Sequence, residues 1–230
     1  MTRQPDLEHA EADERPRYSV AQAARYVQIS PTTLRSWVVG RPYPTAEGDR
    51  YSKPLIIRPV PGDPRLSFSN LREAHVLRAL RTRHEVPMAA VRTALDYAAD
   101  KLNIQRLLLS RELMADAGSL FIERLGQIID LSRSGQIALK EMFDGHLSRI
   151  QWEPIRLFPV VAARGLGGPH IVGIDPQVSF GRPFIVGKGV RTSTIVERLD
   201  AGEDREAVAA DYGLEDFEID EAILYERAAA

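Results

Sequence analysis

The chain has 230 residues, of which 44% are hydrophobic and 27% are charged, and this composition is typical of a globular protein with one large or two small domains. Its longest apolar run, Leu157–Ala163, is short and is interrupted by Pro159, which argues against a membrane span. The sequence has no cysteine, so disulfides, thiolate zinc sites and cysteine nucleophiles are excluded. Because the polar, acidic residues 1–17 lack the apolar core of a signal peptide, we expect a disordered arm there and a cytoplasmic protein.

The net charge of −2 conceals two regions of opposite charge. Residues 18–101 contain 13 Lys or Arg and 7 Asp or Glu, whereas residues 200–230 contain 2 Arg and 11 Asp or Glu. A basic region can meet nucleic-acid phosphates and an acidic region is repelled by them, so we expect two different partners. An acidic helix can equally be an ordinary solvated surface.

Two short helices separated by a tight turn are predicted within Tyr18–Gly40. Ser19 is a good N-cap for the first helix, and Gln22 three residues later completes a capping box. Ser30 followed by Pro31 marks the start of the second helix. This spacing favours a helix–turn–helix, although an αα-hairpin that serves only packing has the same pattern.

The second predicted helix has an apolar side and a polar side. Leu34, Trp37 and Val38 are expected to point inward. The outward side then carries short hydroxyl-bearing and cationic side chains, namely Thr32, Thr33, Arg35 and Ser36. Such side chains suit an element that enters the major groove of DNA and contacts base edges.

A segment rich in proline and glycine follows at residues 41–68. Two β-prone runs in it, Leu55–Arg58 and Leu66–Phe68, flank a Pro-Gly-Asp-Pro turn and predict a two-stranded wing. Four side chains on or beside this wing suit backbone phosphates: Arg50, Tyr51, Lys53 and Arg58. An ordinary basic loop is the alternative.

Two further helices are predicted over Leu71–Arg83 and from Pro87 onward. With them, residues 18–103 resemble the winged helix–turn–helix domain of MerR-type regulators. The resemblance implies that a homodimer binds double-stranded DNA, with the second helix in the major groove. The sequence departs from that family in one respect, because the long heptad-bearing dimerisation helix is missing.

The middle segment, residues 104–163, is expected to be mixed α/β and to serve dimerisation or partner binding. Gly118 and Gly126 separate three short apolar runs that favour strands: Leu107–Leu109, Leu120–Ile122 and Ile128–Leu131. Gln136–Ile150 has helical spacing. Trp152–Ala163 indicates an edge strand, because prolines lie at its margins.

A glycine-rich linker is predicted at residues 164–173, and residues 174–230 form a distinct C-terminal region. This region resembles a small bacterial family that is still described as a domain of unknown function. Its expected elements are a strand pair, Ser179–Phe180 with Phe184–Val186, and three helices: Thr192–Ala201, Arg205–Tyr212 and Glu215–Arg227. The result would be a helix–turn–helix-like bundle. Because carboxylates dominate its third helix, we expect protein contact or dimerisation there rather than DNA binding.

The order of the two regions is similar to that of VapB-type antitoxins whose genes lie beside PIN-domain ribonuclease toxins. The resemblance implies a type II toxin–antitoxin module in which the protein neutralises the ribonuclease and represses its own operon. Two toxin-binding surfaces remain open. The acidic third helix could mimic RNA, or three basic side chains could reach the carboxylates of the toxin: Arg182, Lys188 and Arg191.

The sequence predicts a mainly α fold with short β elements and no catalytic constellation. The five histidines are scattered without metal-ligand spacing, and no nucleophile–base pair is evident. We therefore expect no enzyme activity and no cofactor or metal. Two other functions remain as alternatives: a ligand-responsive MerR-like regulator with an effector pocket in residues 104–163 and no toxin, or a structural adaptor whose first hairpin only packs.

Overall fold

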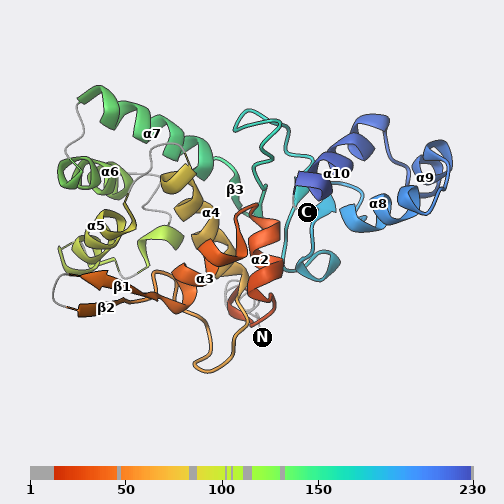
Figure 1. Ribbon diagram of the computed structural model, residues 1–230. Helices are drawn as coiled ribbons and strands as arrows, with labels where there is room; N and C mark the ends of the chain where they lie inside the picture. Colours follow the sequence, from red (N-terminus) through yellow and green to blue (C-terminus); the bar gives the residue numbers. More distant parts are fainter. Residues whose placement is uncertain are drawn as a thin grey trace, which may run out of the picture. The chain divides into compact units, whose positions relative to one another are not determined.

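The computed structural model describes residues 13–45, 48–82, 87–101, 103–104, 106–110, 116–129 and 133–228. Within these ranges the fold is mainly helical, as predicted, with three two-stranded antiparallel sheets (Figure 1). The described residues divide into two compact units. Unit 1 comprises residues 13–31, 59–68 and 149–228, and unit 2 comprises residues within 32–58 and 69–148.

This division does not follow the expected domain boundaries. The first helix of the expected helix–turn–helix, α2 (Val20–Tyr26), belongs to unit 1, whereas α3 (Pro31–Val39) belongs to unit 2 from Thr32 onward. The expected linker at residues 164–173 lies inside unit 1. Most of the expected N-terminal arm, residues 1–12, lies outside the described residues, but Arg17 Nη1 donates to the Pro176 carbonyl at 2.7 Å and is held in unit 1.

Three helices of unit 1 lie close to the positions that the sequence predicts. They are α8 (Thr192–Asp200), α9 (Arg205–Tyr212) and α10 (Asp216–Ala228). Each contributes a buried side chain to one apolar cluster: Ile195, Val208 and Ile219. Leu199 of α8 and Ile223 of α10 pack against the same cluster four residues after Ile195 and Ile219. This helical spacing gives each of the two helices one apolar side, which faces the cluster.

The strand pair of the C-terminal region differs from the expected one. β5 (Val172–Gly173) pairs with β6 (Phe184–Ile185), while Ser179–Gly181 forms a 3₁₀ turn, η3. The expected strand at Ser179–Phe180 is therefore wrong. Val172 and Ile185 face each other and are both buried, so the apolar core selects the partner strand.

A second hairpin of unit 1 replaces the single strand expected at Trp152–Ala163. It pairs β3 (Ile150–Trp152) with β4 (Ile155–Leu157), and the chain reverses at Glu153-Pro154. Ile150 and Leu157 are opposite one another and buried. The prolines at the margins of this segment thus mark a turn as well as an edge.

Unit 2 combines α3 with a hairpin and a group of helices. The hairpin pairs β1 (Arg41–Thr45) with β2 (Gly48–Ser52). The other helical elements are α4 (Phe68–Thr82), α5 (Met88–Lys101), η1 (Leu107–Leu109), α6 (Asp116–Ile128) and α7 (Arg133–Leu147). α6 packs against both α5 and α7, and the three form successive layers in Figure 1.

The strands expected in the middle segment are wrong where the structure describes them. Leu107–Leu109 is a 3₁₀ turn and Leu120–Ile122 lies within α6; Ile128 ends α6, and residues 130–131 lie outside the described part. Gly126 does not interrupt α6. A Cβ at Gly126 would lie 2.6 Å from Gln136 Cγ of α7, so this glycine permits close helix packing instead of breaking a helix.

Candidate nucleic-acid interface

α3 is anchored by its apolar side. Leu34, Trp37 and Val38 are each at most 2% exposed, as the sequence predicts. Burial of a leucine, a tryptophan and a valine on one side fixes the rotation of the helix about its axis. The opposite side is consequently presented outward.

The outward side of α3 carries the four side chains expected to contact bases. Thr32 and Arg35 are exposed, while Thr33 and Ser36 are half-buried. The Ser36 hydroxyl donates to the Thr33 carbonyl at 2.7 Å, so its proton is used within the helix. Thr32 and Arg35 are therefore the most accessible polar groups of the four.

The hairpin lies directly after α3, upstream of the expected wing. The predicted strands Leu55–Arg58 and Leu66–Phe68 are wrong, because Leu66 forms only an isolated bridge and Phe68 begins α4. The amides of Leu55 and Ile56 donate to the Trp37 carbonyl at 2.7 and 3.0 Å. The last carbonyls of a helix have no hydrogen-bond partner within it. Leu55 and Ile56 therefore supply donors to the carboxyl end of α3 and do not form a strand.

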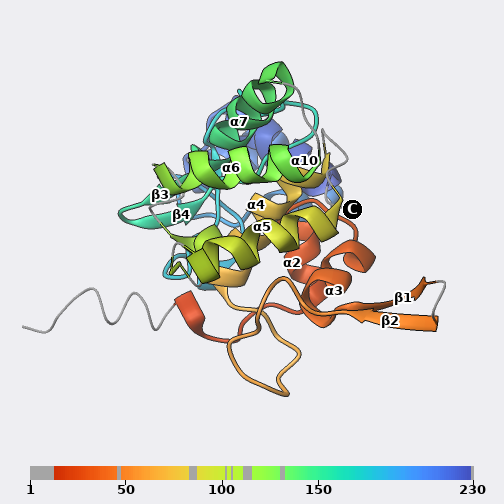
Figure 2. The ribbon, with the colours of Figure 1, turned by 90° about the vertical axis from the view of Figure 1, so that its left-hand side faces the viewer.

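A tight approach joins the hairpin to α3, and Figure 2 shows the two strands extending from the end of the helix. Gly40 has φ +84°, and a Cβ there would lie 2.2 Å from the Ser52 carbonyl oxygen. Tyr51, although 56% exposed, donates its hydroxyl proton to the Val39 carbonyl. Only glycine fits at position 40, so the sequence encodes this junction locally.

Basic side chains line the strands and the segment after them. Lys53 is exposed and Arg58 is half-buried, whereas the side chain of Arg50 lies outside the described part. Arg41, at the start of β1, is exposed as well. Sequence reasoning missed Arg41, and its position immediately after the helix-ending Gly40 is the signal that could have found it.

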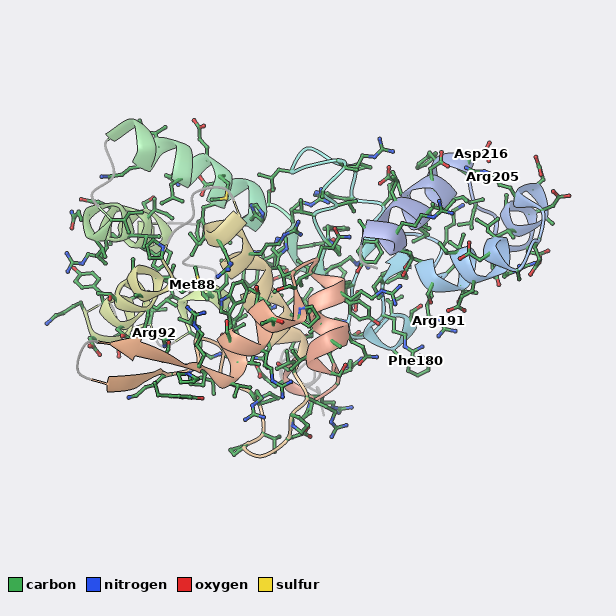
Figure 3. All side chains as sticks on the ribbon, in the orientation of Figure 1. Met88, Arg92, Phe180, Arg191, Arg205 and Asp216 are labelled. Atoms are coloured by element: carbon green, nitrogen blue, oxygen red, sulfur yellow. The ribbon has the colours of Figure 1, made fainter. Side chains whose placement is uncertain are left out.

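Long-range hydrogen bonds hold the segment that carries Lys53. The Arg92 guanidinium of α5 (labelled in Figure 3) donates to the Pro54 carbonyl at 3.2 Å and to Ser52 Oγ at 3.1 Å. Asn70 Nδ2 of α4 donates to the Ile57 carbonyl at 2.9 Å. The segment is therefore fixed relative to α4 and α5, and contacts this distant in sequence could not have been found from spacing.

The acidic helix α10 uses several of its carboxylates inside unit 1. Glu218, Glu221 and Glu226 are at most 8% exposed. Glu226 accepts from both Arg25 of α2 and the Thr192 hydroxyl, and Glu221 pairs with Arg164 at 2.7 Å. On the exposed side, Arg205 bridges Asp216 and Asp220, the first of which is labelled with it in Figure 3.

Further contacts connect α2 with α10. The Tyr225 hydroxyl donates to the Tyr26 carbonyl at 3.1 Å, and Gln28 Nε2 donates to the Tyr225 carbonyl at 3.4 Å. Burial raises the pKa of the Tyr26 phenol above its ordinary value, against a smaller opposing effect from Arg182. The predicted capping box is confirmed at the other end of α2, with Ser19 and Gln22 exchanging bonds of 3.0 and 3.2 Å.

The three basic residues considered for toxin binding have different environments. The Lys188 ammonium donates to the Gly213 carbonyl and lies 3.9 Å from a Glu218 oxygen. Arg182 is exposed and Arg191 is half-buried. The structure therefore gives Lys188 an internal role and leaves Arg182 the most accessible of the three.

The described residues contain no group of three His, Asp or Glu side chains placed to hold a metal ion. In the same ranges, no helix combines the length and the apolar character that crossing a bilayer requires.

Comparison with known proteins identifies relatives of most of the chain. Residues 16–95 match a family described as "Putative DNA-binding HTH domain", and residues 172–225 match "Protein of unknown function (DUF433)". The "Putative antitoxin VapB45" of Mycobacterium tuberculosis is 32% identical over 219 residues, which cover 86% of this chain and 89% of the relative. "Uncharacterized protein Rv2308" of the same organism is 28% identical, covering 90% of this chain and 89% of that protein.

A solved structure shares the fold. The X-ray crystal structure of Rv2018 from Mycobacterium tuberculosis has a TM-score of 0.62 and 25% sequence identity, covering 91% of this chain and 98% of that one. The helix–turn–helix match and the antitoxin relative support a DNA-binding and antitoxin role. On the strength of its extended similarity to VapB45, the chain belongs to the VapB45 antitoxin family.

Proposed function

We propose that this protein is the DNA-binding antitoxin of a type II toxin–antitoxin module, acting in the cytoplasm to neutralise a PIN-domain ribonuclease and to repress its own operon. The observation that carries the DNA-binding part is the outward side of α3, with Thr32 and Arg35 exposed above the buried Trp37. The antitoxin part rests on the VapB45 relative.

In this proposal α3 enters the major groove in the manner of MerR-type regulators, without their dimerisation helix. Thr32, Thr33, Arg35 and Ser36 contact base edges. The phosphate contacts come from the hairpin and the segment after it: Arg41, Arg50, Lys53 and Arg58, joined by Tyr51 when its hydroxyl proton turns from the Val39 carbonyl to a phosphate. A homodimer would place two copies of α3 in half-sites about 34 Å apart.

A gel-shift assay with the DNA upstream of the gene tests this interface. Arg35→Ala should lose about 1–3 kcal/mol of discrimination between the operator and a base-substituted operator, because a side chain that reads a base edge contributes that much. Lys53→Ala should weaken both DNAs equally and reduce the slope of log affinity against log salt by about 1, because it removes one phosphate contact.

Arg81→Ala is the matched control, since Arg81 is exposed on α4 and outside the proposed interface. An Arg35→Ala protein with unchanged affinity and selectivity would contradict the assignment of α3.

A ligand-responsive regulator without a toxin is the second candidate, because unit 2 contains a cavity of about 210 Å³. Its lining combines apolar side chains such as Leu95 with the charged Arg92. Only three lining residues, at positions 106–108, come from the range 104–163 in which the sequence predicts an effector pocket. A ribonuclease gene beside this gene, with co-purification of the two products, favours the antitoxin. A neighbouring metabolic or efflux gene, with a small molecule that changes operator affinity, favours the regulator.

A further inference from the structure

Phe180 has the most exposed large apolar side chain in the described part of the chain, at 84%. It lies in η3, where Ser179 has φ +48° and Phe180 has φ +59°. Residues with a side chain rarely adopt this left-handed region, and two in succession are rarer still. Unit 1 thus holds a strained turn that presents an aromatic ring to solvent, which is the kind of backbone outlier associated with function.

The turn is held firmly on both sides. The buried Tyr18 donates its hydroxyl proton to the Gly181 carbonyl at 2.9 Å, and burial raises the pKa of that phenol. A Cβ at Gly181 would lie 2.4 Å from the Tyr18 oxygen, so the two residues fit only with glycine there. Ser179 Oγ donates to the Gly189 carbonyl at 2.7 Å. A backbone turn fixed in this way loses little conformational entropy when a partner covers the Phe180 ring.

Positive charge lies beside the ring. Arg182 follows the turn and is exposed, and Arg191 lies two residues beyond Gly189 (Figure 3). In the part of the chain that the structure describes, no carboxylate forms an ion pair with either guanidinium, in contrast to Arg164, which has one carboxylate partner, and Arg205, which has two. The surface is therefore complementary to an acidic partner.

The acidic helix α10, the other surface considered for toxin binding, is less suited to that role. Glu218, Glu221 and Glu226 of α10 are buried and bonded within unit 1, so they cannot imitate the phosphates of RNA without breaking these bonds. The exposed Asp216 and Asp220 share Arg205. Arg182 and Arg191, beside the turn, form no ion pair with a described carboxylate, so a partner can use their charge without breaking an internal bond.

We propose that Phe180, flanked by Arg182 and Arg191, is the anchor by which this protein binds the toxin; the inference rests on the proposed antitoxin function. The partner is a protein with an apolar socket bordered by carboxylates, and an acidic-site ribonuclease is of that kind. The ring fills the socket, and the two guanidiniums pair with the carboxylates once the ring excludes water. Buried aromatic and arginine side chains are the usual hot spots of such interfaces.

Calorimetric titration of the full chain with the product of the adjacent gene tests the anchor. Phe180→Ala should weaken binding about 30-fold or more, the loss typical of a hot spot. Phe180→Asn should have the same effect while retaining the turn, because asparagine tolerates the left-handed region. Arg182→Glu should also weaken binding, and more at low salt than at high salt.

Phe217→Ala is the matched control, because Phe217 is 53% exposed on α10 and should bind the toxin like the wild type. Operator binding by the Phe180 variants should be unchanged, which verifies that they fold. If the wild type binds no toxin, the proposed function fails together with the anchor. If the wild type binds and both Phe180 variants bind equally well, the anchor alone is overturned and the antitoxin function stands.

Discussion

α3 and α10 both follow a shorter helix after a tight turn, yet their polar sides are used differently. On α3, Thr32 and Arg35 are exposed, and no described carboxylate forms an ion pair with Arg35. On α10, buried carboxylates such as Glu221 and Glu226 are bonded to basic residues elsewhere in unit 1. The comparison shows that charge along a helix does not by itself identify a binding surface, because availability depends on partners that are distant in the sequence.

Truncation of the buried Trp37 side chain, which fixes α3, should have the largest effect on stability. Trp37→Ala should lower the free energy of unfolding by about 3–5 kcal/mol, the usual cost of truncating a buried aromatic side chain, and operator binding should be lost with it. Denaturant unfolding and the gel shift measure the two effects. Val39→Ala on the same helix, where the side chain is 42% exposed, should change the free energy by no more than about 0.5 kcal/mol. A Trp37→Ala protein of normal stability would show that α3 is not fixed by its apolar side.

A smaller loss is expected when a buried carboxylate of α10 is removed. Glu226→Ala removes the nearer acceptor of the buried Thr192 hydroxyl and leaves it only the Pro183 carbonyl at 3.4 Å. A buried polar group that is poorly satisfied costs about 1–3 kcal/mol. Glu226→Gln retains an acceptor and should lose less. Glu215→Ala, at an exposed position of the preceding turn, provides the control. Equal stability of the Glu226 and Glu215 variants would contradict the distinction between the buried and exposed carboxylates.

The exposed ion pairs of α10 should matter least. Arg205→Ala removes the bridge between Asp216 and Asp220, and solvent-exposed pairs contribute at most about 1 kcal/mol. The difference from the wild type should shrink in roughly 1 M salt, where the screening length is only about 3 Å. Unfolding curves at two salt concentrations measure this, and a loss as large as that of Glu226→Ala would place Arg205 in the structural core of unit 1.

The sequence predicts the structure correctly where interactions between residues close in the sequence determine it. The capping box of Ser19 and Gln22 and the buried side of α3 are as predicted. The three C-terminal helices also lie close to their predicted ranges. In each case the controlling interactions lie within one or two helical turns.

The errors have their origin in long-range contacts. Gly126 is predicted to separate two short strands, although it lies within α6 and accommodates the Gln136 side chain of another helix. The apolar Leu55 and Ile56 suggested a strand, although their amides bind the Trp37 carbonyl. The true hairpin was overlooked because Arg41–Thr45 contains two prolines and lacks apolar alternation. The Arg25–Glu226 pair joins residues that no spacing rule connects.

Unit 1 consists of three stretches that are separated in the sequence. It can therefore fold completely only after the last of them has been synthesised. Arg25 and Tyr26 are synthesised about two hundred residues before their partners Glu226 and Tyr225, so a nascent chain must keep α2 without these contacts until α10 has been made. A protease that removes α10 would return the mature protein to that nascent condition, so a cut in α10 would destabilise α2, which lies far from it in the sequence.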